Sequence, residues 1–314
     1  MIVDQNTFEQ LVLTHRGELH VHCYRMLGSV QDAEDMVQET LLKAWRARAT
    51  FQERASPRTW LYQIATNACL TALARRSPRL LPEHVSAPSG EVAWLEPYPD
   101  HLLERVADTA PGPDVLYDQR EATELAFVAA LQHLPPRQRA VLLMRDVVGL
   151  DVAEVAQQLA SSREAISSAH QRARATLRQR MDRPMQRSLN ASEQRLLERY
   201  AAAWESGDLD GFVDLLSDGV VLSMPPMPEW FAGRAAVRGF FAWAWGPAGP
   251  GPFRLIPTTA NAQPAFGLYG LAPDGDGYTP QAIQVLTLEG DRIARLHGFI
   301  RPDLFGLFGL PARL

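Results

Sequence analysis

Cysteine is scarce in this chain, and long apolar stretches are missing from it. The 314 residues contain two cysteines, Cys23 and Cys69, which read as small buried residues and exclude a disulfide framework. No further ligands are spaced around them for a metal site, and we expect no cofactor. A membrane-spanning helix needs about twenty consecutive apolar residues, and no such run occurs. The N-terminus lacks the basic and apolar segments of a signal peptide, so we expect a cytoplasmic protein.

Positive and negative charges are unevenly distributed along the chain. The formal net charge is −5, and a negative total by itself argues against nucleic acid as a partner. Counted by segment, residues 1–79 carry +2, residues 80–118 carry −7, residues 119–187 carry +4 and residues 188–314 carry −4. Because local charge governs contact with phosphates, the two basic segments remain candidates for DNA binding.

The sequence pattern of residues 1–79 predicts a bundle of three helices. Apolar residues recur at helical spacing through the first of them. Ser29 and Asp32 form a capping-box pattern that begins the second helix. Ser56 caps the third helix, with Pro57 at its first position, where the missing N–H has no cost.

An acidic linker leads to a second helical segment. Residues 80–114 contain six prolines and cannot form a long helix, and their aromatic residues suggest that the linker docks on another part of the chain. In residues 115–187, Asp151 begins a short helix and a tight turn precedes a longer basic helix, which is typical of a helix-turn-helix. The residues expected to be buried on the longer helix are Ile166, Ala169, Ala173 and Leu177.

Residues 188–314 have the pattern of an α+β domain. Glu289-Gly290-Asp291 is a hairpin signal between two strand-like runs. The expected helices are Ala191–Ser206 and Leu209–Leu216, and the expected strands are Gly219–Ser223, Ala282–Leu288 and Arg292–Phe299.

Three surfaces carry side chains suited to binding. The outward face of the longer basic helix bears groups that reach base edges and phosphates in a major groove, although a solvated helix face is the alternative. The second helix bears an acidic stripe, whose expected partner is a basic protein surface. The third helix bears Trp60, Gln63 and Asn67 near Arg54 and Arg58, a combination suited to unpaired bases.

Several motifs occur in a characteristic order. They are Asp32–Thr40 (DAEDMVQET), Ala44-Trp45, Pro57–Asn67 (PRTWLYQIATN), Leu134–Arg139 (LPPRQR) and the helix-turn-helix. The first three resemble region 2, and the last two resemble region 4, of the extracytoplasmic-function sigma-70 factors. The resemblance covers about residues 1–184.

This resemblance implies a sigma factor that binds core RNA polymerase and directs promoter-specific transcription initiation. It implies contact with the β′ clamp and the β flap of the polymerase. The residues that it implies for contact with the clamp are Asp32, Asp35, Gln38 and Glu39. For the melted −10 element it implies Phe51, Arg54, Arg58, Trp60, Gln63 and Asn67. For the −35 element it implies Arg163, Glu164, Ser167, Ser168, Gln171, Arg172 and Arg174. His170 departs from the family, which more often has an apolar residue there.

The C-terminal segment resembles a cone-shaped SnoaL-like domain, through Tyr200–Asp208 and Met224–Arg234. Trp94–Leu103 also looks like the linker of the sigma factors with this fused domain, in which the extension tunes activity. The resemblance suggests a pocket for a small molecule, lined by Trp204, Trp230, Phe231, Phe241, Tyr269 and His297. The alternative is that the aromatic residues fill a core and that His297 is a satisfied strand histidine.

The sequence thus predicts two all-α DNA-binding modules (1–79 and 115–187), a linker (80–114) and a regulatory α+β domain (188–314). Two other functions remain open. One is a ligand-responsive DNA-binding regulator that acts without polymerase, which would need neither the acidic stripe nor a surface for unpaired bases. The other is a SnoaL-like enzyme fused to a DNA-binding half, although no acid–base pair at a clear spacing indicates an active site.

Overall fold

The computed structural model describes residues 5–50, 56–84, 92–104, 117, 121–181, 189–247 and 249–314. The chain divides into two compact units, each with its own hydrophobic core. The helical unit comprises Met1–Leu80 and Asp100–Met185, and the sheet unit comprises Leu81–Pro99 and Gln186–Leu314. The predicted linker of residues 80–114 is therefore shared between the units, and the first part of it belongs to the sheet unit.

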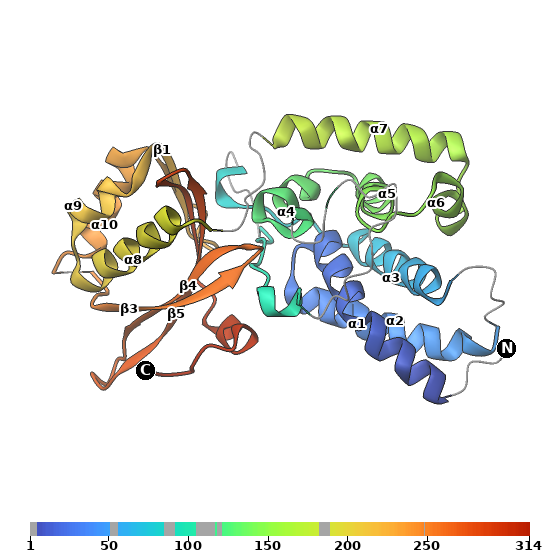
Figure 1. The fold of residues 1–314 in the computed structure, drawn as a ribbon, viewed down its shortest axis with the longest axis horizontal. Coiled ribbons are helices and arrows are strands. Elements are labelled where there is room, and N and C mark those ends of the chain that lie inside the picture. The colour runs from blue at the N-terminus through green and yellow to red at the C-terminus, as the bar shows by residue number, and fades with distance from the viewer. Residues whose placement is uncertain are drawn as a thin grey trace. The chain divides into compact units, whose positions relative to one another are not determined.

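The first three helices form the predicted bundle. Ser29 caps the second helix by accepting a hydrogen bond from the backbone N–H of Asp32 at 3.1 Å, and Ser56 caps the third by accepting from that of Thr59 at 3.0 Å. Each cap satisfies a donor that has no partner inside its helix. The helices are α1 (Gln5–Leu27), α2 (Val30–Ala47) and α3 (Pro57–Leu73), with the short 3-10 helix η1 (Arg48–Thr50) after α2 (Figure 1).

The second helical module contains the predicted helix-turn-helix. Asp151 and Glu154 form the expected capping box, each side chain accepting from the other's backbone N–H at 2.8 Å. Ala160, with φ of 46°, makes the tight turn that follows. The module consists of η3 (Asp100–Leu102), η4 (Glu121–Thr123), α4 (Leu125–Gln132), α5 (Pro136–Asp146), α6 (Val152–Gln158) and α7 (Arg163–Arg180).

Buried arginines join the two modules inside the helical unit. Arg25 of α1 donates to the Ala122 carbonyl at 2.9 Å and to the Thr123 hydroxyl at 2.8 Å. Arg139 of α5 donates to the Met26 carbonyl of α1 and, at 2.7 Å, to the Gln132 side chain. Burial lowers the pKa of Arg139 to about 10, which reflects the cost of removing a guanidinium from water.

The sheet unit is built on one mixed sheet of six strands in the order β2-β1-β6-β5-β4-β3. Strands β1 and β6 are parallel, and the other neighbours are antiparallel. The strands are β1 (Leu216–Ser223), β2 (Trp230–Ala232), β3 (Phe253–Ala260), β4 (Gln263–Leu271), β5 (Tyr278–Glu289) and β6 (Arg292–Phe299). The expected α+β fold is confirmed.

Three helices cover one face of this sheet: α8 (Ala191–Ser206), α9 (Leu209–Asp214) and α10 (Arg234–Ala244) (Figure 1). The expected bounds of α8 and β6 are correct. The second helix was expected to reach Leu216, but it ends earlier because Leu216 pairs with Ile293 of β6. The sequence patterns did not predict β2, β3, β4 and α10.

The core beneath these helices is aromatic, and it corrects the predicted pocket. Trp204 and Phe241 pack edge to face with ring centroids 5.2 Å apart, and both are buried core residues. Trp230 is 43% exposed, so it does not line an interior. Tyr269 and His297 each follow a core leucine along a strand, and since successive side chains alternate they point to the opposite face. The six residues therefore do not enclose one cavity.

The opposite face of the sheet is covered by the linker and the C-terminal segment. The 3-10 helix η5 (Pro302–Phe308) places Phe305 against Tyr269, with ring centroids 5.1 Å apart. The Tyr269 hydroxyl donates to the Pro311 carbonyl at 2.8 Å. In the linker, η2 (Pro82–His84) brings Glu83 to within 3.6 Å of His297. Each face of the sheet is therefore packed against other segments of the same unit.

Candidate nucleic-acid interface

The exposed face of α7 carries most of the residues predicted to read DNA. Ser162 begins the helix by accepting from the backbone N–H of Ala165 at 3.1 Å. Ile166, Ala173 and Leu177 are buried as predicted, whereas Ala169 is only half-buried. Ser167 is half-buried, and the residues that face solvent are Arg163, Glu164, Ser168, Gln171 and Arg172.

Arg174 differs from the other predicted readers because it is held inside the module. Its Nε and Nη2 atoms donate to the two carboxylate oxygens of Asp146 at 2.8 and 2.6 Å. His170 lies 2.8 Å from the same carboxylate. Burial raises the pKa of Asp146, but the hydrogen bonds from His170 and Arg174 outweigh that effect and hold it below its usual value. This cluster ties α7 to α5 and gives His170 a polar partner.

The acidic stripe of α2 is only partly free for a partner. Asp35 and Gln38 are exposed, and Glu39 forms a 2.5 Å ion pair with Lys43 one turn away. Asp32 is mostly buried and pairs with two arginines after α3, Arg76 at 2.6 Å and Arg79 at 2.8 Å. Burial raises the pKa of Asp32, while the arginine hydrogen bonds and charges lower it further and give a net decrease.

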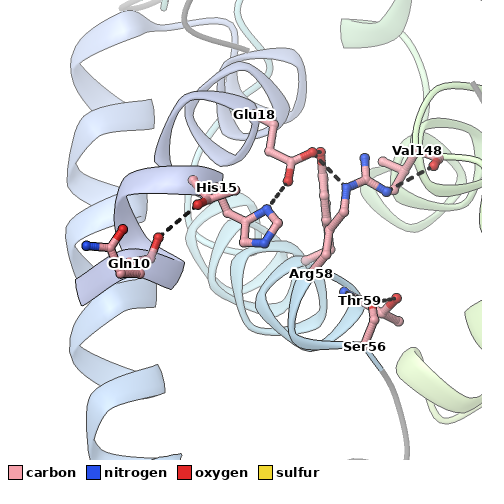
Figure 2. A network of polar contacts seen from close by, with 9 residues as sticks. Gln10, His15, Glu18, Ser56, Arg58, Thr59 and Val148 are labelled. Carbon is pink, nitrogen blue, oxygen red and sulfur yellow. Dashed lines mark hydrogen bonds and ion pairs between the residues drawn. The ribbon is translucent and has the colours of Figure 1, made fainter. Parts of the chain in front are cut away.

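Helix α3 presents part of the surface predicted for unpaired bases. Asn67 is exposed, and Trp60 and Gln63 are half-buried. Phe51 and Arg54 lie outside the described residues. Arg58 is not free, because its Nε donates to Glu18 of α1 at 2.8 Å (Figure 2).

Glu18 is the centre of a polar network that was not predicted from the sequence. Its buried carboxylate lies 2.5 Å from His15 Nδ1 (Figure 2). The same carboxylate accepts from the Tyr62 hydroxyl at 3.1 Å. Arg58 also reaches the Val148 carbonyl of the second module at 3.5 Å. Burial raises the pKa of Glu18, and the His15 hydrogen bond with the Arg58 charge lowers it to a net value below the usual range. A lone acidic residue 40 positions from Arg58 gives no pattern that could predict this pair.

The linker is attached to the sheet unit by specific polar contacts. The backbone N–H of Tyr98 donates to Asn261 Oδ1, and the backbone N–H of Asn261 donates to the Tyr98 carbonyl, both at 2.8 Å. Glu96 accepts from Arg301 at 2.9 Å, and the pKa of Arg301 is raised by its hydrogen bonds to Asp303 and Glu96. Tyr98 is fully buried, as a linker that docks would require.

A second attachment involves the histidine that was placed in the predicted pocket. His297 Nδ1 lies 2.9 Å from the Ser223 hydroxyl and 3.6 Å from Glu83 Oε1 of the linker. Arg295 adds a longer ion pair to Glu83, at 3.8 Å. His297 is thus a partnered strand histidine under the linker, which agrees with the alternative reading of this residue.

Neither a metal centre nor a membrane span emerges from the part of the chain that the structure describes. Within it, no three His, Cys, Asp or Glu side chains gather as metal ligands, and no helix is both long and apolar enough to cross a bilayer.

Comparison with known families agrees with this architecture. Residues 11–79 match the family model of Sigma-70 region 2, residues 124–177 that of Sigma-70 region 4, and residues 197–296 that of the SnoaL-like domain. The two helical modules and the covered sheet thus define an RNA polymerase sigma factor with a fused SnoaL-like domain.

The chain belongs to the extracytoplasmic-function (ECF) RNA polymerase sigma factors. It is 44% identical over 314 residues to the ECF RNA polymerase sigma factor SigG of Mycobacterium tuberculosis, with 96% of this chain and 83% of SigG covered. It is 28% identical to SigJ of the same organism, over 92% of this chain and 90% of SigJ. The crystal structure of SigJ matches 98% of this chain and 100% of its own, with a TM-score of 0.62 and 25% identity. Both named relatives are thus RNA polymerase sigma factors.

Proposed function

We propose that this sigma factor reads the −35 element with the solvent-facing side of α7. The observation that carries the proposal is the row of Arg163, Ser168, Gln171 and Arg172 on one exposed face of a capped helix. Arginine and amide side chains on such a face can form paired hydrogen bonds with base edges. Arg174 is assigned a supporting role, since Asp146 occupies its guanidinium.

The other contacts follow from the exposed parts of region 2. Asp35, Gln38 and Glu39 are proposed to face the β′ clamp of the polymerase in the cytoplasm, with Asp32 holding the stripe in place. Trp60, Gln63 and Asn67 are proposed to handle the melted −10 element, together with Phe51, Arg54 and Arg58. Arg58 can contact DNA in this way only after its hydrogen bond to Glu18 breaks. Contact of region 4 with the β flap completes the proposal.

Two neighbouring arginines on α7 test the assignment. Arg172→Ala is expected to weaken binding to a −35 duplex by about 1–3 kcal/mol, because it removes a base contact while leaving the fold intact. Arg174→Ala is expected to destabilise the protein by about 1–3 kcal/mol, because it leaves Asp146 partly unpaired in a buried position. DNA binding by anisotropy and unfolding in urea measure the two effects. Equal loss of affinity for all DNA sequences in Arg172→Ala would mark a phosphate contact instead.

We further propose that the sheet unit modulates promoter output by holding the linker. The linker joins the two DNA-binding modules in sequence, and residues 81–99 are part of the sheet unit through Tyr98–Asn261, Glu96–Arg301 and Glu83–His297. Because the linker is attached at several points, its freedom, and thereby that of the modules it connects, depends on these contacts.

Releasing the linker tests this second proposal without removing the domain. The double variant Asn261→Ala with Arg301→Ala removes contacts at two points and is expected to change run-off transcription from a cognate promoter in the same direction as deletion of residues 190–314. Arg313→Ala, which removes an exposed pair with Asp274 on the same unit, is the control and should leave the output unchanged. If deletion changes the output but linker release does not, the domain acts by another route.

A ligand in the cone interior finds no support in the packing. Tyr200, Trp204, Phe212 and Phe241 fill the space beneath the helices with ring contacts of 4.6 to 6.2 Å. We therefore do not propose catalysis on an apolar substrate.

A further inference from the structure

We propose that the sheet unit carries a binding site for a small phosphorylated molecule in a cavity beside α8. The cavity has a volume of about 440 Å³, and residues of α8, α9, α10 and the β5–β6 hairpin line it. A volume in this range is typical of small-molecule sites. Its charged lining consists of Arg195, Arg199, Arg234, Arg292, Asp214 and Asp291.

The charge of this lining selects the chemistry of the ligand. Four guanidinium groups face two carboxylates, which leaves a local excess of positive charge in a domain whose residues 188–314 carry −4. Guanidinium groups match phosphate oxygens through paired, charge-assisted hydrogen bonds. Leu196 is the single apolar residue of the lining, so the site does not suit an apolar ligand.

The arginines of the site make few contacts within the domain. Arg195 and Arg199 lie one turn apart on the exposed face of α8 and make no hydrogen bond or ion pair within the described part of the chain. Arg234 forms one ion pair, from its Nε to the 96% exposed Asp218 at 3.3 Å, and Asp218 is not part of the cavity lining. Arg292 lies 3.9 Å from Asp291, beyond hydrogen-bond distance. All donors of Arg195 and Arg199, and the terminal nitrogens of Arg234 and Arg292, are therefore available to an anion.

The two carboxylates of the lining narrow the chemical class of the ligand further. Asp214 and Asp291 can accept hydrogen bonds from hydroxyl groups but would repel a bare anion. Arg234 is the first residue of α10, whose N-cap, Gly233, supplies no side-chain acceptor, so the positive end of that helix dipole also favours a phosphate. A sugar phosphate or nucleotide satisfies both kinds of group, with its phosphate on the arginines and its hydroxyls on the aspartates.

Calorimetric titration of the full-length protein with ribose 5-phosphate tests the proposal. We expect saturable binding that is stronger than that of inorganic phosphate and absent for ribose. The variant Arg195→Gln with Arg199→Gln should weaken it by roughly 10- to 100-fold, since two charge-assisted donors are lost. Arg238→Gln is the control, because Arg238 is an exposed arginine of α10 that pairs with Asp210 outside the cavity.

Three outcomes would overturn the proposal. They are no binding of any phosphate probe, binding that is equal in the double variant and the control, and binding of duplex DNA alone. The last outcome would make these arginines contacts to a DNA backbone. Circular dichroism of each variant separates loss of binding from loss of the fold.

Discussion

At the scale of single residues, internal ion pairs decide which predicted contacts are free. Asp32, Arg58 and Arg174 were all expected to face a partner, yet each forms pairs at 2.6 to 2.8 Å within the helical unit. Neighbouring residues of the same type, such as Asp35 and Arg172, are exposed. Side-chain chemistry predicts the same role for Asp35 as for Asp32, and for Arg172 as for Arg174. Only the packing of the fold distinguishes the exposed residue from the paired one.

Two buried histidines predict how the stability depends on pH. Burial lowers the pKa of His20 to about 4 and that of His22 to about 3. Below about pH 6.5 the unfolded chain binds protons at these positions and the folded chain does not, so acid favours unfolding. Stability should fall as the pH is lowered from about 6.5 towards 4, by up to about 1.4 kcal/mol per pH unit for each histidine.

His22→Gln isolates one of these groups. Glutamine can keep a hydrogen bond to Thr66, which lies 2.9 Å from His22 Nε2, but it does not titrate. Urea unfolding between about pH 7 and pH 4.5 should show a shallower loss of stability in this variant. An identical slope in both proteins would exclude His22 as a source of the pH dependence.

At the scale of elements, the C-terminal segment and the sheet are fitted to each other through a glycine. A Cβ atom at Gly267 of β4 would lie 2.7 Å from Leu310 Cδ1 and 3.2 Å from Phe305 Cε1. Such distances are shorter than ordinary contacts, so a side chain here would require Leu310 and the Phe305 ring to move.

Gly267→Ala should therefore displace the C-terminal segment. We expect a loss of about 1–3 kcal/mol from overpacking, together with faster proteolytic cleavage after β6. Gly219→Ala is the matched control, because a Cβ at Gly219 of β1 would meet nothing within 4 Å. Equal protease resistance of the two variants would contradict the close fit.

At the scale of the whole molecule, the two modules of the helical unit are joined by buried hydrogen bonds. Gln132 of α4 donates to the Arg25 carbonyl at 3.3 Å, and Arg139 supports the same junction from α5. Gln158 of α6 reaches the Thr59 carbonyl of α3 at 3.3 Å. Region 2 and region 4 are therefore packed together here, and the pairs around Arg58 form part of that packing.

Arg139→Ala should loosen both modules together. It leaves the Gln132 side chain and several carbonyls without their donor, which costs about 3 kcal/mol or more. Hydrogen exchange should then become faster in α1 as well as in α5, with exposed Arg172→Ala as the control. Faster exchange confined to α5 would show that the modules open independently.

Some helices and strands could be predicted from the sequence and others could not, because only some of them carry local sequence signals. Helices with caps and one buried face, such as α7 and α8, were found because those signals are local. Strand β4 was missed because it is buried on both faces and shows no alternation, and it also contains two glycines. Helix α10 carries a glycine among aromatic residues, which hides its period.

The sequence by itself determined the order of the modules, their caps and their motifs, since these depend on residues a few positions apart. Tertiary structure decided which charges stay free, which sheet face Tyr269 and His297 take, and where the linker docks. Those outcomes depend on partners such as Glu18 with Arg58 or Tyr98 with Asn261, which are far apart in the chain and meet only when the cores form. Burial then fixes the pairing, because an unpaired charge or backbone group in the interior is too costly to keep.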